Sequence, residues 1–321
     1  MVEYRGIDVV VKESGVVILK QRERSDEIYA LHTILRRIPK NLISHEYISN
    51  MLSPAEAGFS GEVKTDQFLK ELTLSTNYNI LQDLIILKTH STVQIDTIII
   101  TQKFVCILEI KNMTGEFYFD SDHYQFYRIK KDGTKEPQRS PEIQLRRAVG
   151  TIKSIFEENE IGLPVYGIIV FASRSGIVME KPKHFPAVLL DYLNEYIGRI
   201  DKSLELVHPD ESTQIAHHLL GKHVTPQFDC VFQRYGINKK WVMPGVICPA
   251  CGNLPMKRLY SKWCCSKCGN NSKDAHLITL QEFRLLFDKN ISNRQAGWFL
   301  DIPNRDTNRR AILRGNVSAF P

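Results

Sequence analysis

The apolar residues of this chain follow two different periods, and the period changes several times along the sequence. Near-continuous apolar runs rich in Val and Ile predict strands at residues 78–87, 93–101, 104–112 and 163–173. A period near 3.6 residues predicts helices at residues 26–38, 53–72 and 141–159. Together with a short strand pair at 115–121 and 123–129, this order predicts an α/β core in which helices cover a sheet.

The ends and faces of these helices are also predicted. Pro39 ends the first helix, because proline cannot continue the hydrogen-bond ladder. Ser53 suits the N-cap of the second helix and Pro54 its first position. In the third helix Ile143, Ala148, Ile152 and Ile155 fall along one apolar face.

Charged residues interrupt the most apolar strands. If strands 93–101 and 104–112 pair across Gln102-Lys103 as a two-residue loop, Asp96 faces Glu109 and Gln94 faces Lys111 on one face of the sheet. Opposed side chains lie about 5 Å apart, so two carboxylates there destabilise the pair unless a cation lies between them. Gln-Lys is not the Asn-Gly type that tight hairpins favour, so a longer loop with a shifted register is the alternative.

This set of side chains suits metal chemistry. Carboxylates and waters provide the octahedral oxygen ligands that Mg²⁺ requires, which makes Asp96 and Glu109 candidate ligands. A lysine two residues beyond Glu109 on the same face can neutralise charge that develops on a phosphoryl oxygen. The alternative is a solvent-facing strand surface with a salt bridge.

The surrounding residues resemble the NERD (nuclease-related domain) family of the PD-(D/E)XK nuclease superfamily. The shared segments are GFSGE, VQID, LEIKNMTG, SPEIQ and VYGIIVFAS, which begin at residues 58, 93, 108, 140 and 165. The resemblance implies a restriction-endonuclease-like mixed sheet flanked by helices. It also implies a metal-dependent phosphodiesterase site of Glu62, Asp96, Glu109 and Lys111, with Gln144 as an accessory group. The family often has Asn where this chain has Ser140, so the resemblance assigns Ser140 no role.

A second centre is predicted from five clustered cysteines. CPACG at 248–252 and CSKCG at 265–269 are two C-x2-C-G knuckles whose spacing is typical of a four-cysteine zinc ribbon. Cys248, Cys251, Cys265 and Cys268 are the predicted zinc ligands, with Cys264 as the alternative to Cys265. Disulfides are the other interpretation of these cysteines.

Charge is concentrated around the same cysteines. The formal charge of the 321-residue chain is +6, yet residues 239–273 alone carry seven Lys or Arg and no Asp or Glu. Such a window indicates a polyanionic partner, and Lys257 and Arg258 are the predicted contacts within it. Tyr260 and Trp263 are candidates to stack on bases, although Trp263 equally suits the small core of the ribbon.

The end of the chain reads as helix, turn, helix. One helix is predicted from Asn293 to Leu300, and a second from Asn304 to Leu313. Cations on the second helix, Arg305, Arg309 and Arg310, are the predicted contacts of a helix-turn-helix with DNA. A plain helical hairpin is the alternative.

These features predict a metal-dependent nuclease that acts on nucleic acid, with DNA favoured over RNA. It would use Mg²⁺ or Mn²⁺ for catalysis and Zn²⁺ for structure. The alternatives are a non-catalytic nucleic-acid-binding regulator and a protein-interaction adaptor. We see no secretory signal and no apolar run that could span a membrane, so a cytoplasmic location is expected, with a homodimer possible by analogy to the superfamily.

Five segments are expected along the chain. They are an N-terminal extension (1–52), the nuclease-like core (53–175), a helical extension and linker (176–240), the zinc ribbon (241–275) and a helical segment (276–321).

Overall fold

The computed structural model describes residues 10–11, 15–89, 91–205, 211–225, 231–287 and 290–302. Contacts divide the chain into two compact units. The first consists of Met1–Glu23 and Ala57–Pro226, and the second of Arg24–Glu56 and Gln227–Pro321. The five segment boundaries expected from the sequence remain predictions.

The first unit is built on a seven-stranded mixed sheet with the order β1-β2-β3-β4-β5-β9-β11. Its strands are β1 (Val10–Val11), β2 (Val16–Lys20), β3 (Tyr78–Lys88), β4 (Ser91–Thr101), β5 (Val105–Lys111), β9 (Val165–Phe171) and β11 (Ala187–Leu189). β3, β4 and β5 form an antiparallel meander, whereas β9 runs parallel to β5 and β11 parallel to β9. The predicted α/β class, with a mixed sheet between helices, is confirmed.

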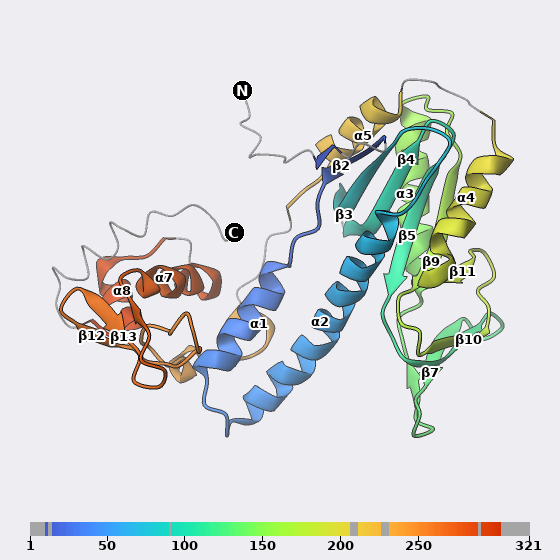
Figure 1. Ribbon diagram of the computed structural model, residues 1–321. Helices are drawn as coiled ribbons and strands as arrows, with labels where there is room; N and C mark the ends of the chain where they lie inside the picture. Colours follow the sequence, from blue (N-terminus) through green and yellow to red (C-terminus); the bar gives the residue numbers. More distant parts are fainter. Residues whose placement is uncertain are drawn as a thin grey trace. The chain divides into compact units, whose positions relative to one another are not determined.

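Helices cover both faces of this sheet (Figure 1). On one face α3 (Pro141–Glu158) and α5 (Ser212–Gly221) bury Leu145, Ile152 and Ile215 against alternate residues of β4 and β5. On the other face α4 (Leu193–Ser203), preceded by the short helix η1 (Leu190–Tyr192), buries Leu193 and Ile197. Both faces of the strands are therefore apolar, which explains their continuous Val and Ile runs.

A second, four-stranded sheet follows the carboxyl end of β5. Its order is β10-β6-β7-β8, formed by β6 (Gly115–Asp120), β7 (Gln125–Ile129), β8 (Lys135–Pro137) and β10 (Gly176–Glu180). The chain leaves this sheet at β8 and enters α3 directly. Because α3 leads back to the start of β9, which is parallel to β5, the first turn of α3 lies toward the carboxyl ends of β5 and β9.

The predicted start of the second helix is wrong. That helix, α2 (Ile43–Leu69), begins ten residues before Ser53 and carries Pro54 in its interior. Proline removes one backbone hydrogen bond from a helix without necessarily ending it. Capping residues within a longer apolar period therefore gave a false start signal.

The second unit combines helices with a three-stranded sheet of order β12-β13-β14. The helices are α1 (Asp26–Arg37), α6 (Val231–Arg234), η2 (Lys239–Trp241), α7 (Ala275–Leu286) and α8 (Asn293–Leu300), and the strands are β12 (Lys257–Leu259), β13 (Lys262–Cys264) and β14 (Asn271–Ser272). The fully buried Arg37 pairs with the carboxylate of Glu282, 2.9 Å from Nε, and so joins α1 to α7. A buried pair of this kind is tolerated only when both charges are satisfied.

The C-terminal prediction is tested only in part. The first helix lies at the predicted residues, Asn293–Leu300, and starts with a capping box between Ser292 and Gln295. The predicted second helix, with Arg305, Arg309 and Arg310, lies outside the described residues. Within the described part of the chain, no helix is long and apolar enough to cross a membrane.

Candidate active site and cysteine cluster

The predicted register of the β4–β5 hairpin is confirmed. Thr97 pairs with Leu108 and Ile100 with Val105, as the two-residue loop requires. The loop lacks the Asn-Gly sequence of tight hairpins, and the side chain of Thr101 stabilises it instead. Its hydroxyl accepts hydrogen bonds from the backbone N–H groups of Lys103 (3.0 Å) and Phe104 (2.8 Å).

The β4–β5 ladder includes neither the predicted pair of Asp96 with Glu109 nor that of Gln94 with Lys111. The β4–β5 ladder ends at Thr97 and Leu108, and Gln94 instead pairs with Ile85 of β3 while its amide donates to Asp83 (2.8 Å). Ile95 and Ile98 belong to the same core cluster, so the alternation of side chains is interrupted at Asp96. A backbone irregularity of this kind was not expected from the sequence pattern.

Asp96, Glu109 and Lys111 nevertheless come together where the ladder ends. Asp96 Oδ2 accepts a hydrogen bond from the backbone N–H of Ile110 (2.8 Å), which ties the carboxylate to β5. Lys111 Nζ lies 2.6 Å from Glu109 Oε1, and the Glu109 side chain is only 6% exposed. The aliphatic strands thus hold two carboxylates and an ammonium toward the carboxyl end of β5.

Glu62 reaches this region through an arginine that the sequence analysis missed. Arg22, which follows β2, donates from Nη1 to Glu62 (2.8 Å) and from Nε to Asp66 (2.9 Å). Its Nη2 donates to the carbonyl oxygen of Asp96 (2.7 Å) and the hydroxyl of Thr97 (2.9 Å). One buried guanidinium therefore connects β2, α2 and β4.

The residues missed differ in how visible they are in the sequence. Asp66 lies four residues after Glu62 on α2, so the helical spacing could have placed both carboxylates on one face. Arg22 lies in the charged run KQRERSDE, which has no feature that separates it from a solvated linker.

The charges of this group do not balance. Glu62, Asp66, Asp96 and Glu109 bring four negative charges, against two positive charges from Arg22 and Lys111. Burial raises the pKa of Glu62 to about 7, although Arg22 opposes the shift. Burial, together with the neighbouring Asp96, likewise raises the pKa of Glu109 to about 7. When all four carboxylates are ionised, the group has two uncompensated negative charges, which a bound divalent cation would offset.

Close packing between α2 and the end of β5 explains the presence of Gly61 and Asn112 in the shared segments. Asn112 directly follows Lys111, and its amide donates to the carbonyl of Ala57 on α2 (2.7 Å). A Cβ atom at Gly61 would lie 2.3 Å from Cβ of Asn112. Glycine at 61 therefore lets the helix that carries Glu62 approach the end of β5.

Gln144 lies elsewhere in the same unit. It belongs to the first turns of α3, and no described hydrogen bond joins it to the carboxylates. Its Oε1 atom is buried and accepts no hydrogen bond from the described residues. Its neighbour Ile143, from the predicted apolar face, is 54% exposed and lines a groove beside β7 and β8.

The four predicted zinc-binding cysteines come together in the second unit. The sulfur atoms of Cys248, Cys251, Cys265 and Cys268 all lie within 4.8 Å of one another. Cys248 and Cys268 are 3.7 Å apart, and Cys251 and Cys265 3.6 Å, measured between sulfurs. Four sulfurs at about 2.3 Å from a tetrahedral zinc would be about 3.8 Å apart, so the group fits this ion.

Each knuckle has the backbone needed for this closeness. Gly252 and Gly269 adopt φ values of +69° and +72°, and their N–H groups donate to the carbonyls of Cys248 and Cys265. Burial raises the pKa of the Cys248 thiol, but backbone N–H donors from Cys251 and Ala250 outweigh it and lower the pKa to about 6.

The remaining residues around the ribbon are placed as follows. Cys264 lies on β13, paired with Lys257 and Asn271, and is not part of the group of four. The Trp263 side chain is buried in the ribbon core, so it cannot stack on bases, whereas Tyr260 is fully exposed. Lys257 is exposed, and the guanidinium of Arg258 lies 4.9 Å from the centre of the Trp263 ring.

Comparison with known proteins identifies one part of the chain. Residues 57–172 match the family model of the nuclease-related domain. The chain therefore carries a NERD domain. That domain includes Glu62, Asp96, Glu109, Lys111 and Gln144, while Arg22 and the four cysteines lie outside it. No curated protein and no solved structure matches the chain.

Proposed function

We propose that the protein is a metal-dependent nuclease that hydrolyses phosphodiester bonds of nucleic acid at the carboxylates of β4 and β5. The observation that carries the proposal is the charge deficit of this group. The half-buried Asp96 and the buried Glu109 meet beside Lys111 within a NERD domain, and with Glu62, Asp66 and Arg22 included the ionised group has two negative charges in excess. Such an excess is unfavourable in a protein interior unless a cation is bound.

The residues have distinct proposed roles. Asp96 and Glu109 would hold Mg²⁺ or Mn²⁺, and Glu62 would orient a water ligand from α2. The bound ion supplies an activated water and stabilises charge on the phosphoryl oxygens. Lys111 stands 2.6 Å from Glu109, where its ammonium can neutralise the charge that develops on the phosphate. Arg22 is a positioning residue, since it fixes Glu62 and Asp66.

The second unit supports nucleic acid as the substrate. A zinc-bound ribbon would retain a charge of about +5 over residues 239–273, because four thiolates and one Zn²⁺ sum to −2. Lys257 and Arg258 belong to this basic window and would contact phosphates. We favour DNA as the substrate, with Arg305, Arg309 and Arg310 as further contacts.

A cleavage assay tests the proposal. Plasmid DNA, single-stranded DNA and RNA are incubated with the protein and Mg²⁺, Mn²⁺ or no added metal. Cleavage should require metal and fall at least a hundredfold in Asp96→Ala and Lys111→Ala, because each removes a charge from the reacting centre.

Exposed residues of the same unit provide the controls. Asp122→Ala and Lys153→Ala remove the same charges outside the site and should leave cleavage unchanged. Cleavage that persists in both Asp96→Ala and Lys111→Ala contradicts the assignment. Salt-dependent binding without cleavage under any metal would instead indicate a non-catalytic nucleic-acid-binding protein.

A further inference from the structure

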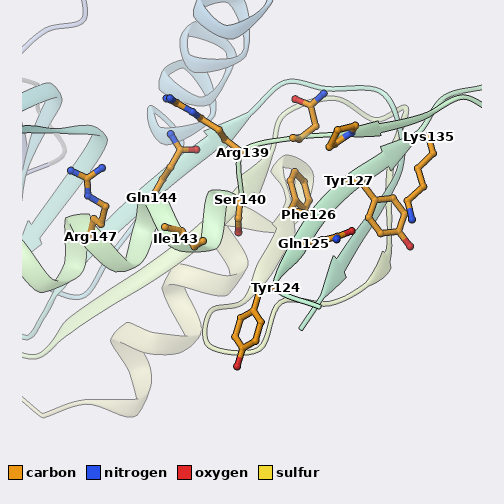
Figure 2. Close-up of a pocket in the computed structure, with 12 residues that line it drawn as sticks. Tyr124, Gln125, Phe126, Tyr127, Lys135, Arg139, Ser140, Ile143, Gln144 and Arg147 are labelled. Carbon is orange, nitrogen blue, oxygen red and sulfur yellow. The ribbon is translucent and has the colours of Figure 1, made fainter. Parts of the chain in front are cut away.

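A groove of about 900 Å³ lies between the small sheet and the start of α3. Figure 2 shows Ile143, Gln144 and Arg147 of α3 on one side of it, Tyr127 and Lys135 on the other, and Tyr124 at its mouth. The groove belongs to the same unit as the carboxylates, and the first turn of α3 lies toward the carboxyl end of β5, which ends at Lys111. The α3 wall of the groove and the candidate active site therefore lie toward the same end of β5.

The lining of this groove is aromatic and cationic. Its cations are Lys135, Arg139 and Arg147, and none of the residues that line it is Asp or Glu. Arg139 and Arg147 are exposed, and neither pairs with a carboxylate of the described residues. By contrast, the nearby cations Arg128 and Lys130 both pair with Glu136. The unpaired arginines indicate an anionic ligand.

Tyr124 places an exposed aromatic ring at the groove. It stands at the turn between β6 and β7 with φ +56°, a conformation that is costly for a bulky residue, and its side chain is 92% exposed. A large ring held open to solvent at a strained turn neither fills a core nor relieves the backbone. It does provide a flat face for another ring to stack on.

Tyr127 continues the aromatic surface. It stacks on Tyr118 of β6 with 5.0 Å between ring centres, and Lys135 Nζ lies 3.6 Å from its centre. Tyr118 and Lys135 thus occupy this ring within the protein, and Lys135 adds an ammonium to the wall of the groove. On the opposite wall, Gln144 adds a polar side chain to the lining.

We propose that this groove binds a single-stranded segment of nucleic acid, with a base stacked on Tyr124 and phosphates held by Arg139 and Arg147. An exposed ring beside unpaired cations is typical of single-strand binding, because bases in a duplex have no free faces. This inference rests on the proposed function, because it names single-stranded nucleic acid as the substrate class of the carboxylate site.

Binding of short oligonucleotides by the whole protein, without added divalent metal, tests the groove. The probes are fluorescein-labelled dT8, rU8 and a blunt 16-base-pair duplex. Tyr124→Ala should weaken dT8 binding about tenfold, as expected for the loss of one stacked base, while Tyr124→Trp retains it. Arg147→Ala should weaken binding and flatten its salt dependence. The ratio of the dT8 and rU8 affinities distinguishes DNA from RNA as the ligand.

The chain offers a matched control for Arg147. Arg146 is the preceding residue on α3 and is equally exposed, but it does not line the groove, so Arg146→Ala should leave dT8 binding unchanged. Duplex binding should change less than twofold in every variant. Equal losses for duplex and dT8, or unchanged dT8 binding in both Tyr124→Ala and Arg147→Ala, would overturn the proposal.

Cross-linking separates this groove from the basic second unit. With 4-thiothymidine in the oligonucleotide, the adducts should include peptides that contain residues 124–147. Adducts confined to other residues contradict the groove. If the groove binds dT8 but no metal supports cleavage, the proposed nuclease fails and the groove stands. If cleavage occurs but dT8 binding is independent of Tyr124 and Arg147, the proposed nuclease stands and the groove proposal fails.

Discussion

The cysteine cluster and the carboxylate cluster are assembled in opposite ways. All four cysteines come from two short knuckles within 21 residues, and each knuckle makes its own backbone turn. The carboxylate cluster is built from the segment after β2, from α2, from β4 and from β5. In the sheet, β3 and β4 lie between β2, which precedes Arg22, and β5, which carries Glu109. The sulfurs already lie within reach of one ion, whereas the carboxylates are held by cations of the protein itself.

This difference shows what a local pattern can encode. Knuckle geometry depends on a few neighbouring residues, so sequence spacing determines it. The charge balance of a site built from distant elements depends on the whole sheet. The cysteine cluster should lose its metal when one ligand is removed. The carboxylate cluster should be disrupted when a partner from a distant part of the sequence is removed.

The largest expected effect is the loss of one zinc ligand. Cys265→Ser should reduce bound zinc from about one ion per chain to near zero and unfold the ribbon, since structural zinc contributes on the order of 10 kcal/mol to such small folds. Cys264→Ser should retain the metal, because Cys264 lies on β13 outside the group. Elemental analysis of the purified variants measures this. Zinc loss in Cys264→Ser alone would reverse the ligand assignment.

Removal of Arg22 should disturb the other cluster alone. Arg22→Ala leaves Glu62 and Asp66 without their cation, and breaking a buried pair in this way typically costs about 3–5 kcal/mol. Denaturant unfolding of the first unit should show the loss, while the zinc content stays unchanged. Arg22→Lys, which restores the charge without the fork of donors, should recover only part of the stability.

The two clusters should respond oppositely to pH. Glu62 and Glu109 have pKa values of about 7 in the folded protein and about 4.5 when unfolded, so the fold binds more protons between these values. Stability of the first unit should therefore fall as the pH rises from about 4.5 to 7, and level off above. Zinc binding by the thiolates should strengthen over the same range.

Hydrogen exchange that is corrected for intrinsic rates measures both trends at separate amides. Peptides from β5 should open more easily at pH 8 than at pH 5.5, and ribbon peptides less easily. The β5 trend should weaken in Glu109→Gln, which cannot ionise. A β5 trend of the same size in that variant would remove Glu109 from the explanation.

Two glycines of α2 should give the smallest effects, with opposite signs. Gly58→Ala meets no atom within 4 Å and should stabilise the helix by about 0.5–1 kcal/mol. Gly61→Ala forces a Cβ to within 2.3 Å of Asn112 and should destabilise by about 1–3 kcal/mol. Thermal unfolding of both variants, compared with the unmodified protein, checks the pair. Equal shifts would mean that α2 and the end of β5 are not closely packed.

The sequence predicted what its local patterns encode. The strands, their register across Gln102-Lys103 and α3 followed from apolar runs and one loop length, and the knuckles followed from cysteine spacing. The true start of α2 did not, because Ser53 and Pro54 imitate a helix start inside a longer helix.

Non-local features were not predictable in this way. The interruption at Asp96 depends on how β3 pairs on the other side of β4, and Gln94 turned to Asp83 as a result. Arg22 acquires its role only when the sheet brings β2 beside β3. Ile143 fits an apolar helical face, yet the groove leaves it exposed.

The arginine after β2 also bears on where the domain should be cut. The match to the NERD family begins at residue 57, after both Arg22 and β2. A fragment trimmed to residues 57–172 would expose the edge of β3 and leave Glu62 and Asp66 without their guanidinium. A version of this domain that is expressed by itself should therefore include residues 15–23, because the structural unit is longer than the segment that matches the family.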